Sequence, residues 1–243
     1  MAIAHPLPDS PRVTLAKQKV HIWRVFLDQS DEWIQQLAGT LSPDERARAD
    51  TFYFERDRRR FIVSRGFLRR ILSSYLETGP DRLQFCYGKY GKPALAGQCG
   101  VQSLRFNLSH SHEFAAYAVA FEREVGIDIE YMRSIAEMEQ LVERFFCPGE
   151  IAAFYAFHAG ERREAFFRGW TRKEAYLKAT GTGLSQVPNQ VEVTLCRAPA
   201  RLLKIAGQVH KSLCWSLRDL ELAPGYACAL SAAGGGYQIE FMS

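Results

Sequence analysis

The hydrophobic pattern of the chain predicts β-strands in both of its halves. Hydrophobic and polar residues alternate over 20–27 (VHIWRVFL) and again over 104–111 (LRFNLSHS), and this period of two is typical of strands. Strand-like segments follow at 114–122 (FAAYAVAFE) and 124–132 (EVGIDIEYM). Beyond residue 190 the chain shows short strand-like segments separated by turns: VEVTLC, RLLKIAGQ, SLCWSLRDL, YACALSAA and YQIEFMS.

Helical spacing of hydrophobic residues predicts two helices in the first half. Ser42 is the expected N-cap of the first helix and Pro43 its first residue, because both residue types suit those positions. A longer helix is expected over 55–76. One of its faces is small or apolar, with Phe61, Ser64, Leu68, Ile71, Leu72 and Tyr75 at helical spacing. Its remaining surface is crowded with arginines, at positions 58, 60, 65, 69 and 70.

The second half begins with helical patterns. Residues 134–146 run into a further helical segment over 147–157, and 160–185 predicts one long helix. Gly181 and Gly183 are well placed to end that helix, because glycine readily takes the left-handed conformation of a C-cap. Strands and helices are thus mixed along the whole chain.

Each half offers a few strands and one or two long helices, which predicts an α+β fold. We expect two similar α/β lobes with a cleft between them. The boundary is expected near 122–127, immediately before the acidic strand. This division gives an N-terminal lobe over 1–124 and a C-terminal lobe over 125–243.

Composition and charge narrow the class of protein. The 243 residues are 47% hydrophobic and 24% charged, which is typical of a globular protein. No apolar run approaches the roughly 20 residues of a membrane span, and no secretion signal is recognisable, so we expect a cytoplasmic protein. The six cysteines are spread singly without a CxxC pair, which argues against structural zinc. A net charge of +4 does not indicate a nucleic-acid binder, but it suits an anionic ligand or an acidic partner protein.

The segment GIDIE, residues 126–130, places two carboxylates in an otherwise apolar strand. Because side chains alternate along a strand, Asp128 and Glu130 share one face, with their Cα atoms about 7 Å apart. Both carboxylates can reach one hard cation from there, and without a cation they repel each other. The alternative is an edge strand with a solvated acidic face.

Trp170, Glu174 and Lys178 follow at steps of four in the long helix and therefore share one face. On spacing alone, a surface ion pair between Glu174 and Lys178 is the simpler explanation. The helix is rich in aromatic residues, however, so one of its sides must be packed. Ionisable groups beside that packed side are candidates for a functional site.

Three further motifs each leave two interpretations open. GKYGKP, residues 88–93, fails the phosphate-loop template because proline follows Lys92, so it is a flexible basic turn that either binds an anion or is simply exposed. NLSHSH offers Ser109, His110, Ser111 and His112, either as small polar groups that bind an anion at a strand end or with a histidine satisfied in the core. RFFCPGEIAAF indicates core packing or a docking ridge. The arginine-rich helix favours an anion site or a solvated face over nucleic acid, because its aromatic residues follow the core stripe.

In their order and spacing these motifs resemble the 4′-phosphopantetheinyl transferases, and among them the surfactin-synthetase-activating (Sfp) type, which has two homologous lobes. The series runs LSPDERxR, two further arginines, GKP, FNLSHS, GIDIE, FFxxxE and WTRKEAYLKATGTGLS, within about 40–190. The combination of GIDIE with W-x-x-K-E-x-x-x-K is highly specific. The leader and the last fifty or so residues carry no diagnostic motif.

The resemblance implies a Mg²⁺-dependent transferase with its active site at the lobe interface. Such enzymes move the phosphopantetheine arm of coenzyme A onto a serine of an acyl or peptidyl carrier protein in fatty acid, polyketide or nonribosomal peptide biosynthesis. Adenosine 3′,5′-bisphosphate is released. Asp128, Glu130 and Glu174 match the family's ligands for Mg²⁺, with Mn²⁺ as the alternative ion. Glu174 is the expected base for the serine proton, and Lys178 is expected at the leaving phosphate.

Further residues match the family's contacts with coenzyme A and the carrier. The coenzyme A contacts are Arg48, Arg60, Arg65, Gly91, Lys92, Pro93, Ser109, His110 and Lys178. Position 48 is arginine where some relatives have lysine, and Glu45 stands where some relatives carry a base, which removes one possible phosphate contact. Phe145, Phe146 and the helix from Glu150 correspond to the carrier-docking region.

Two rival functions use the same residues. Another Mg²⁺-dependent phosphoryl-transfer or nucleotide-hydrolysing enzyme could employ the three carboxylates, and it would turn over without a carrier protein. A non-catalytic protein could bind acidic partners through its arginines without any cation. Neither nucleic acid nor a membrane is an expected partner, and two fused lobes predict a monomer.

Overall fold

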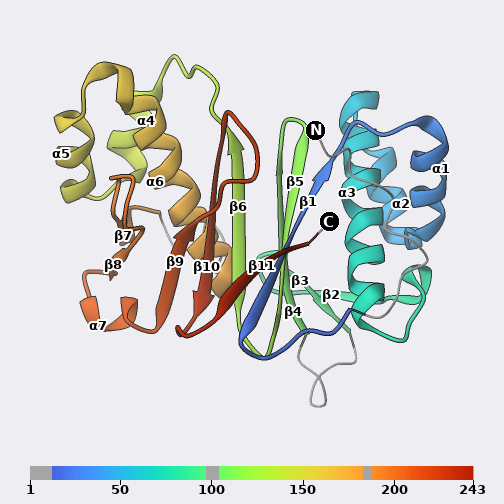
Figure 1. The fold of residues 1–243 in the computed structure, drawn as a ribbon. Coiled ribbons are helices and arrows are strands. Elements are labelled where there is room, and N and C mark those ends of the chain that lie inside the picture. The colour runs from blue at the N-terminus through green and yellow to red at the C-terminus, as the bar shows by residue number, and fades with distance from the viewer. Residues whose placement is uncertain (1–12, 97–103, 183–187, 243) are drawn as a thin grey trace.

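The computed structural model describes residues 13–96, 104–182 and 188–242. These residues form four layers (Figure 1): one layer of helices, two β-sheets packed face to face, and a second layer of helices. Along the chain, runs of helices and runs of strands follow one another instead of alternating one by one, as is typical of an α+β fold. The predicted α+β class is confirmed.

The first sheet and its helices come mainly from the first half of the chain. The strands are β1 (Lys19–Phe26), β4 (Leu104–Ser111), β5 (Phe114–Phe121) and β11 (Gln238–Met242). The helices over the outer face are α1 (Asp31–Thr40), α2 (Pro43–Asp50) and α3 (Glu55–Tyr75). Between α3 and β4 the chain forms η1 (Pro80–Arg82), β2 (Phe85–Tyr87) and β3 (Pro93–Leu95). The strand order is β11-β1-β5-β4, and β11 returns from the end of the chain to pair in parallel with β1.

The second sheet and its helices come from the second half. The strands are β6 (Val125–Tyr131), β9 (Trp215–Asp219) and β10 (Tyr226–Ala233), in the order β6-β10-β9. The helices are α4 (Met138–Phe145), α5 (Pro148–Ala156) and α6 (Ala159–Thr180). Smaller elements complete this half: η3 (Pro188–Gln190), β7 (Val191–Val193), β8 (Leu202–Ile205) and α7 (Val209–Ser212). α6 packs along β6 and β10.

Alternation along β6 assigns its side chains to two different layers. Val125, Ile127 and Ile129 are fully buried in the core between the two sheets. Small alanines of β5 face them there, which lets the two sheets approach closely. Because neighbouring residues of a strand point to opposite faces, Asp128 and Glu130 lie on the side of α6. The period of two thus sets the acidic residues apart from the apolar ones.

In each half, a buried ion pair connects the long helix with a shorter helix before it. Glu45, in the first turn of α2, accepts a hydrogen bond from the amide of the N-cap residue and forms an ion pair of 2.6 Å with Arg69 of α3. Glu150, in the first turn of α5, likewise accepts a hydrogen bond from the amide of its N-cap residue and forms an ion pair of 2.6 Å with Lys173 of α6. All four side chains are at most 2% exposed. Removing one partner would leave a buried charge uncompensated, so these pairs hold α3 and α6 in place.

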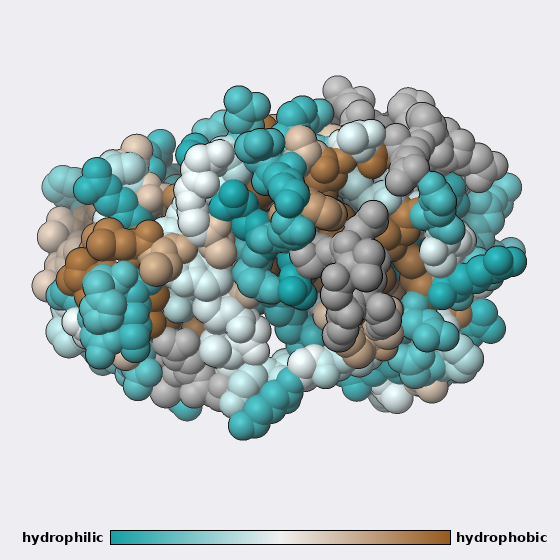
Figure 2. Space-filling model, turned by 90° about the horizontal axis from the view of Figure 1, so that it is seen from below, coloured by the Kyte–Doolittle hydropathy of each residue, from teal (hydrophilic) through white to brown (hydrophobic). Residues whose placement is uncertain are grey.

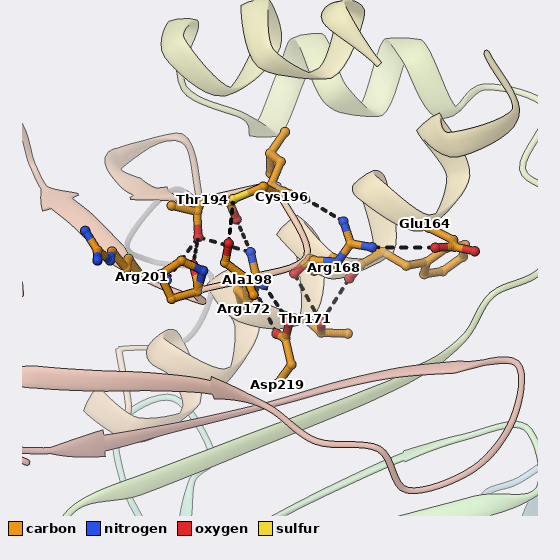
Figure 3. A network of polar contacts seen from close by, with 12 residues as sticks. Glu164, Arg168, Thr171, Arg172, Thr194, Cys196, Ala198, Arg201 and Asp219 are labelled. Atoms are coloured by element: carbon orange, nitrogen blue, oxygen red, sulfur yellow. Dashed lines mark hydrogen bonds and ion pairs between the residues drawn. The ribbon is translucent and has the colours of Figure 1, made fainter. Parts of the chain in front are cut away.

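A buried arginine ties α6 to the second sheet (Figure 3). Arg172 is 0% exposed and donates two hydrogen bonds to the carboxylate of Asp219 at the end of β9, of 2.8 and 2.5 Å. It donates a third to Thr194 Oγ1 at 3.1 Å. Arg168, one turn earlier in the helix, donates to the carbonyl of Leu195 at 2.6 Å. Because a paired guanidinium has a fixed geometry, this network sets the orientation of α6 on the sheet.

The molecule carries some hydrophobic surface at its ends. Figure 2 shows such surface at the left, on the side of the second helical layer. Exposed hydrophobic side chains of that half include Leu203 of β8, Val209 of α7 and the neighbouring Leu213. Within residues 13–96, 104–182 and 188–242, no helix has both the length and the apolarity needed to cross a membrane.

The predicted element ends are largely confirmed. α2 begins at Pro43 with Ser42 as its N-cap. α6 ends at Gly181, whose φ of +68° is the left-handed conformation expected of a C-cap glycine. Gly183 lies outside the described residues. The helix predicted over 134–146 begins later, at Met138.

Candidate active site

β6 and α6 touch at Gly126, and this contact builds the site. A Cβ atom on Gly126 would lie 2.1 Å from the carbonyl oxygen of Ala175 and 2.2 Å from the amide nitrogen of Ala179. Both atoms belong to the backbone of α6, so only glycine allows the helix to come this close. The close approach places the acidic side chains of β6 beside the polar face of α6.

Asp128 lies at the centre of this arrangement and is 3% exposed. Its Oδ1 accepts hydrogen bonds from Lys178 Nζ at 2.6 Å and from Ser109 Oγ at 2.9 Å. Lys178 Nζ also donates to Ser109 Oγ at 2.8 Å. Side chains from β4, β6 and α6 therefore converge on one carboxylate. The alternative explanation of GIDIE, a solvated acidic face, is wrong for Asp128.

The other two predicted carboxylates crowd around Asp128. Burial raises the pKa of Glu174, the charge of Asp128 raises it further against the charge of Lys178, and Glu130 adds to the increase. Burial is also the main cause of the raised pKa of Glu130, whose Oε2 accepts a hydrogen bond from Ser111 Oγ at 2.6 Å. Both shifts indicate a site where additional positive charge would be stabilising.

The donor atoms of the site fit a hard divalent cation. Among the described residues, Asp128 Oδ2 and Glu174 Oε1 are buried without a hydrogen-bond partner. Carboxylate oxygens of this kind are what Mg²⁺ and Mn²⁺ prefer. In the same described part of the chain, no three His, Cys, Asp or Glu side chains are positioned as a ready metal cage. Binding through all three carboxylates therefore requires a movement of their side chains.

A cleft of about 540 Å³ opens beside the carboxylates. Asp128, Glu130 and Glu174 all line it. Its walls also include six of the predicted coenzyme A contacts: Arg65, Gly91, Pro93, Ser109, His110 and Lys178. The aromatic side chains of Phe61 and Trp170 also line the cleft. Residues of both halves thus meet in one cleft at the junction of the two sheets.

Three basic side chains, Lys178, Arg60 and Arg65, act on His110 in the cleft. The side chain of His110 opens onto the cleft, yet the surrounding protein lowers its pKa, and the charges of Lys178, Arg60 and Arg65 lower it further. Arg65 is held in place by Tyr87, whose hydroxyl accepts a hydrogen bond from Nη2 at 3.2 Å. The site therefore combines carboxylates for a cation with cations for an anion.

Three predicted coenzyme A contacts do not line the cleft: Arg48, Arg60 and Lys92. The charge of Arg60 nevertheless acts on His110. Lys92 is largely buried, and its Nζ donates to the carbonyl of Ala179 at the end of α6 at 2.7 Å and pairs with Glu124 at 3.2 Å. Arg48 is exposed on α2, with its guanidinium 5.7 Å from the centre of the Phe52 ring. Phosphate contacts by Arg48, Arg60 and Lys92 stay predictions.

Glu45, which stands where some relatives have a basic residue, has another function in this chain. Glu45 is buried in its ion pair with Arg69, and its Oε1 lies 3.8 Å from Nε of Arg65. The carboxylate therefore supports the cleft wall from behind instead of reaching a phosphate.

The predicted docking residues lie at different depths. Phe146 is 2% exposed and stacks on Phe166, and Glu150 is equally buried in its pair with Lys173. Phe145 is half-buried, and its ring packs edge-on against Trp170 at 5.6 Å between centres. Of the three side chains, only that of Phe145 has more than a trace of accessible surface.

Sequence reasoning missed Asn107 and gave Ser111, one of the candidate polar residues of NLSHSH, no contact with the neighbouring strand. Asn107 Oδ1 accepts a hydrogen bond from the amide of Ile127 at 2.9 Å, and Ser111 Oγ accepts one from the amide of Tyr131 at 3.1 Å. Both residues come from β4 and reach β6. The available signal was the alternation of small polar residues at 107, 109 and 111 in LRFNLSHS, which places them on one face.

Comparison with known proteins identifies the family. A model described as 4′-phosphopantetheinyl transferase, N-terminal, matches residues 26–122, and one described as the 4′-phosphopantetheinyl transferase superfamily matches 124–231. The chain belongs to the 4′-phosphopantetheinyl transferase family. It is an enzyme of the Sfp type with two similar lobes, and it transfers 4′-phosphopantetheine to a carrier protein. The family uses coenzyme A.

Two sequence relatives agree with this assignment, and one solved structure is similar to part of the chain. The 4′-phosphopantetheinyl transferase HetI of Nostoc sp. is 43% identical over 97% of this chain and 96% of that protein. The 4′-phosphopantetheinyl transferase Sfp of Bacillus subtilis is 26% identical over 87% of this chain and 92% of that protein. The crystal structure of holo-[acyl-carrier-protein] synthase from Thermotoga maritima is 24% identical, covers 46% of this chain and 62% of that one, and has a TM-score of 0.36.

Proposed function

We propose that the cleft between β4, β6 and α6 binds coenzyme A together with a divalent cation. Asp128, Glu130 and Glu174 would hold the cation, with Mg²⁺ as the expected ion and Mn²⁺ as the alternative. The observation that carries this proposal is the pair of buried carboxylate oxygens, Asp128 Oδ2 and Glu174 Oε1, which lack a hydrogen-bond partner among the described residues. A cation bound there would offset negative charge on the phosphoryl oxygens of the substrate.

The positive side of the cleft is proposed to bind the phosphates of coenzyme A. Desolvation by burial lowers the pKa of His110, and after it the charges of Lys178, Arg60 and Arg65 lower it further against the charge of Asp128. A phosphate in that place would be attracted by the same three basic side chains. A lowered pKa keeps His110 neutral at pH 7, so it offers one N–H donor. Ser109 offers a hydroxyl beside it. Gly91 and Pro93 would form the wall near the nucleotide, and Arg48 and Lys92 remain proposed contacts at that end.

The transfer itself is proposed as an in-line displacement. The hydroxyl oxygen of the carrier serine forms a bond to the phosphorus that bears the pantetheine arm, and the bond from that phosphorus to the bridging oxygen breaks. The electron pair stays on the leaving adenosine 3′,5′-bisphosphate. Glu174 accepts the serine proton, a role that suits a carboxyl whose pKa is raised towards neutrality. Lys178 stabilises the leaving phosphate through its ammonium group.

We propose that the carrier protein docks beside the cleft and contacts the accessible part of the half-buried Phe145. The Phe145 ring packs on Trp170, which lines the cleft, so a carrier bound there would present its serine close to Glu174. The net charge of +4 favours an acidic acyl or peptidyl carrier domain, and association should weaken with salt. We further propose that the enzyme is a monomer and that it works in the cytoplasm. The singly spread cysteines support the cytoplasmic location.

The test is to incubate the enzyme with coenzyme A, Mg²⁺ and an apo carrier protein, and to measure the intact mass of the carrier. The expected result is a gain of one phosphopantetheine unit, abolished by Asp128→Ala and by Glu174→Gln. Glu122→Gln is the matched control, because this exposed carboxylate pairs with Lys17 outside the cleft. Full activity of Asp128→Ala would contradict the role of the carboxylates. Release of adenosine 3′,5′-bisphosphate without a carrier would favour a hydrolytic enzyme.

A further inference from the structure

β4 and β6 lie beside each other at the active site although they belong to different sheets. β4 is an edge strand that pairs through its backbone with β5, and β6 is an edge strand that pairs with β10. In the described part of the chain, no backbone ladder connects β4 with β6. The main-chain amides of β6 that face β4 therefore need other partners.

Side chains of β4 supply these partners. The amide of Ile127 donates to Asn107 Oδ1 at 2.9 Å, and the amide of Tyr131 donates to Ser111 Oγ at 3.1 Å. Between them Ser109 Oγ donates to the carboxylate of the intervening Asp128 at 2.9 Å. Residues 107, 109 and 111 share one face of β4, so the three side chains form a row along the edge of β6. We call this row the seam.

The seam joins the two parts of the catalytic cleft. β4 carries Ser109 and His110, which line its anion-binding side, and β6 carries Asp128 and Glu130. In-line transfer requires the substrate phosphates and the carboxylates to be in register. A displacement of about 1 Å between reacting groups can cost about 100-fold in rate. A full backbone ladder would fix this register through many bonds, whereas here a few side chains fix it.

We propose that Asn107 and Ser111 are positioning residues for phosphopantetheinyl transfer, which set the register of the carboxylate strand against the strand that carries Ser109 and His110. This inference rests on the proposed function, because it takes the carboxylates of β6 as part of the transfer machinery. Asn107 is 4% exposed, does not line the cleft, and acts only through the backbone of β6. Ser111 also donates to Glu130 at 2.6 Å, so it positions one carboxylate in addition to the strand.

Asn107 provides the cleaner test because its side chain touches no proposed ligand group. Asn107→Leu keeps the approximate size and removes the acceptor, whereas Asn107→Asp keeps an acceptor oxygen. Ser30→Ala is the matched control, because Ser30 Oγ also accepts a hydrogen bond from a main-chain amide, that of Trp33 at 3.4 Å, at the N-cap of α1 and away from the cleft. The measurements are kcat for carrier loading, the dissociation constant of coenzyme A, and hydrogen exchange of the Ile127 amide.

For Asn107→Leu we expect kcat to fall by about 10- to 100-fold while the affinity for coenzyme A changes by less than about threefold. Exchange of the Ile127 amide should accelerate. Asn107→Asp should recover most of the rate, and Ser30→Ala should retain it. A wild-type kcat in Asn107→Leu, equal losses in the Leu and Asp variants, or a matching loss of coenzyme A binding would each overturn the proposal.

A second pair of variants covers the case in which Asn107→Leu does not fold. Ser111→Ala should lose rate and Ser111→Thr, which keeps the hydroxyl, should retain it. Equal rates in these two variants would overturn the role of Ser111. Asp128→Ala assayed in parallel distinguishes a failure of the proposed function from a failure of the positioning role. Full activity of that variant refutes the proposed carboxylate role. Hydrogen exchange of the Ile127 amide reports on the seam independently of activity.

Discussion

Replacing Gly126 with alanine should push α6 away from β6 and so separate Glu174 from the carboxylates of β6. The new Cβ atom would lie 2.1 Å from the carbonyl oxygen of Ala175, and such contacts essentially never fall below 3.0 Å. The clashing atoms belong to the helix backbone, so no change of rotamer can relieve them. α6 must therefore retreat from β6 by about 0.9 Å, the difference between these two distances. This movement carries Glu174 away from the carboxylates of β6.

Two magnitudes follow from that displacement. Overpacking of this kind typically costs about 1–3 kcal/mol of folding free energy, and we expect the upper part of that range because the obstacle is backbone. A displacement of about 1 Å at catalytic groups corresponds to a loss of about 100-fold in kcat. Denaturant unfolding measures the first quantity and the rate of carrier loading measures the second.

Gly160→Ala is the matched control, because it lies in the same helix and no atom stands within 4 Å of the added carbon. It should keep both stability and rate. If Gly126→Ala equalled the wild-type protein in both measurements, the close approach of α6 to β6 would be unnecessary and the reasoning would be refuted.

Four further predictions concern buried pairs, protonation, phosphate binding and the cation. Lys173→Met should lower the unfolding free energy by about 3–5 kcal/mol, because it leaves the Glu150 carboxylate buried and unpaired. The double variant Lys173→Met with Glu150→Gln should recover part of the lost free energy, as measured by urea unfolding. The raised pKa of Glu174 means that its stabilising contribution is present below its ordinary pKa of 4.5 and is lost as the pH rises through the raised value. In thermal unfolding without cation, Glu174→Gln should therefore exceed the wild-type protein in stability at pH 7 but not below pH 4.5. Arg65→Ala should weaken coenzyme A binding in calorimetric titration, by less at high salt than at low salt. A chelator should stop carrier loading and added Mg²⁺ should restore it, whereas loading that persists in chelator would remove the need for a cation.

Local properties of the chain were predictable from the sequence. The alternation in EVGIDIEYM sufficed to place Asp128 and Glu130 on one face of a strand, because the period of two belongs to the strand itself. The end of α6 at Gly181 followed from the conformational freedom of glycine in the same way. The specific combination of GIDIE with the W-x-x-K-E-x-x-x-K helix then indicated the family.

Contacts between distant segments could not be derived in this way. Nothing in YQIEFMS indicates that β11 pairs in parallel with β1, because strand partners are chosen by the tertiary fold. The polar residues of β4 were visible, but the strand beside them was not, so Asn107 was missed and the contact of Ser111 with β6 was not foreseen. Glu45 and Glu150 likewise reveal their buried ion pairs only once α3 and α6 are packed.

The central claim is that Asp128, Glu130 and Glu174 share one divalent cation beside the phosphates of coenzyme A. The most direct test is an anomalous-diffraction map from crystals grown with Mn²⁺ and coenzyme A. The account predicts a single strong peak within bonding distance of all three carboxylates, with the diphosphate of coenzyme A completing the coordination. A well-ordered coenzyme A with the Mn²⁺ peak elsewhere, or with none near these side chains, would contradict the account.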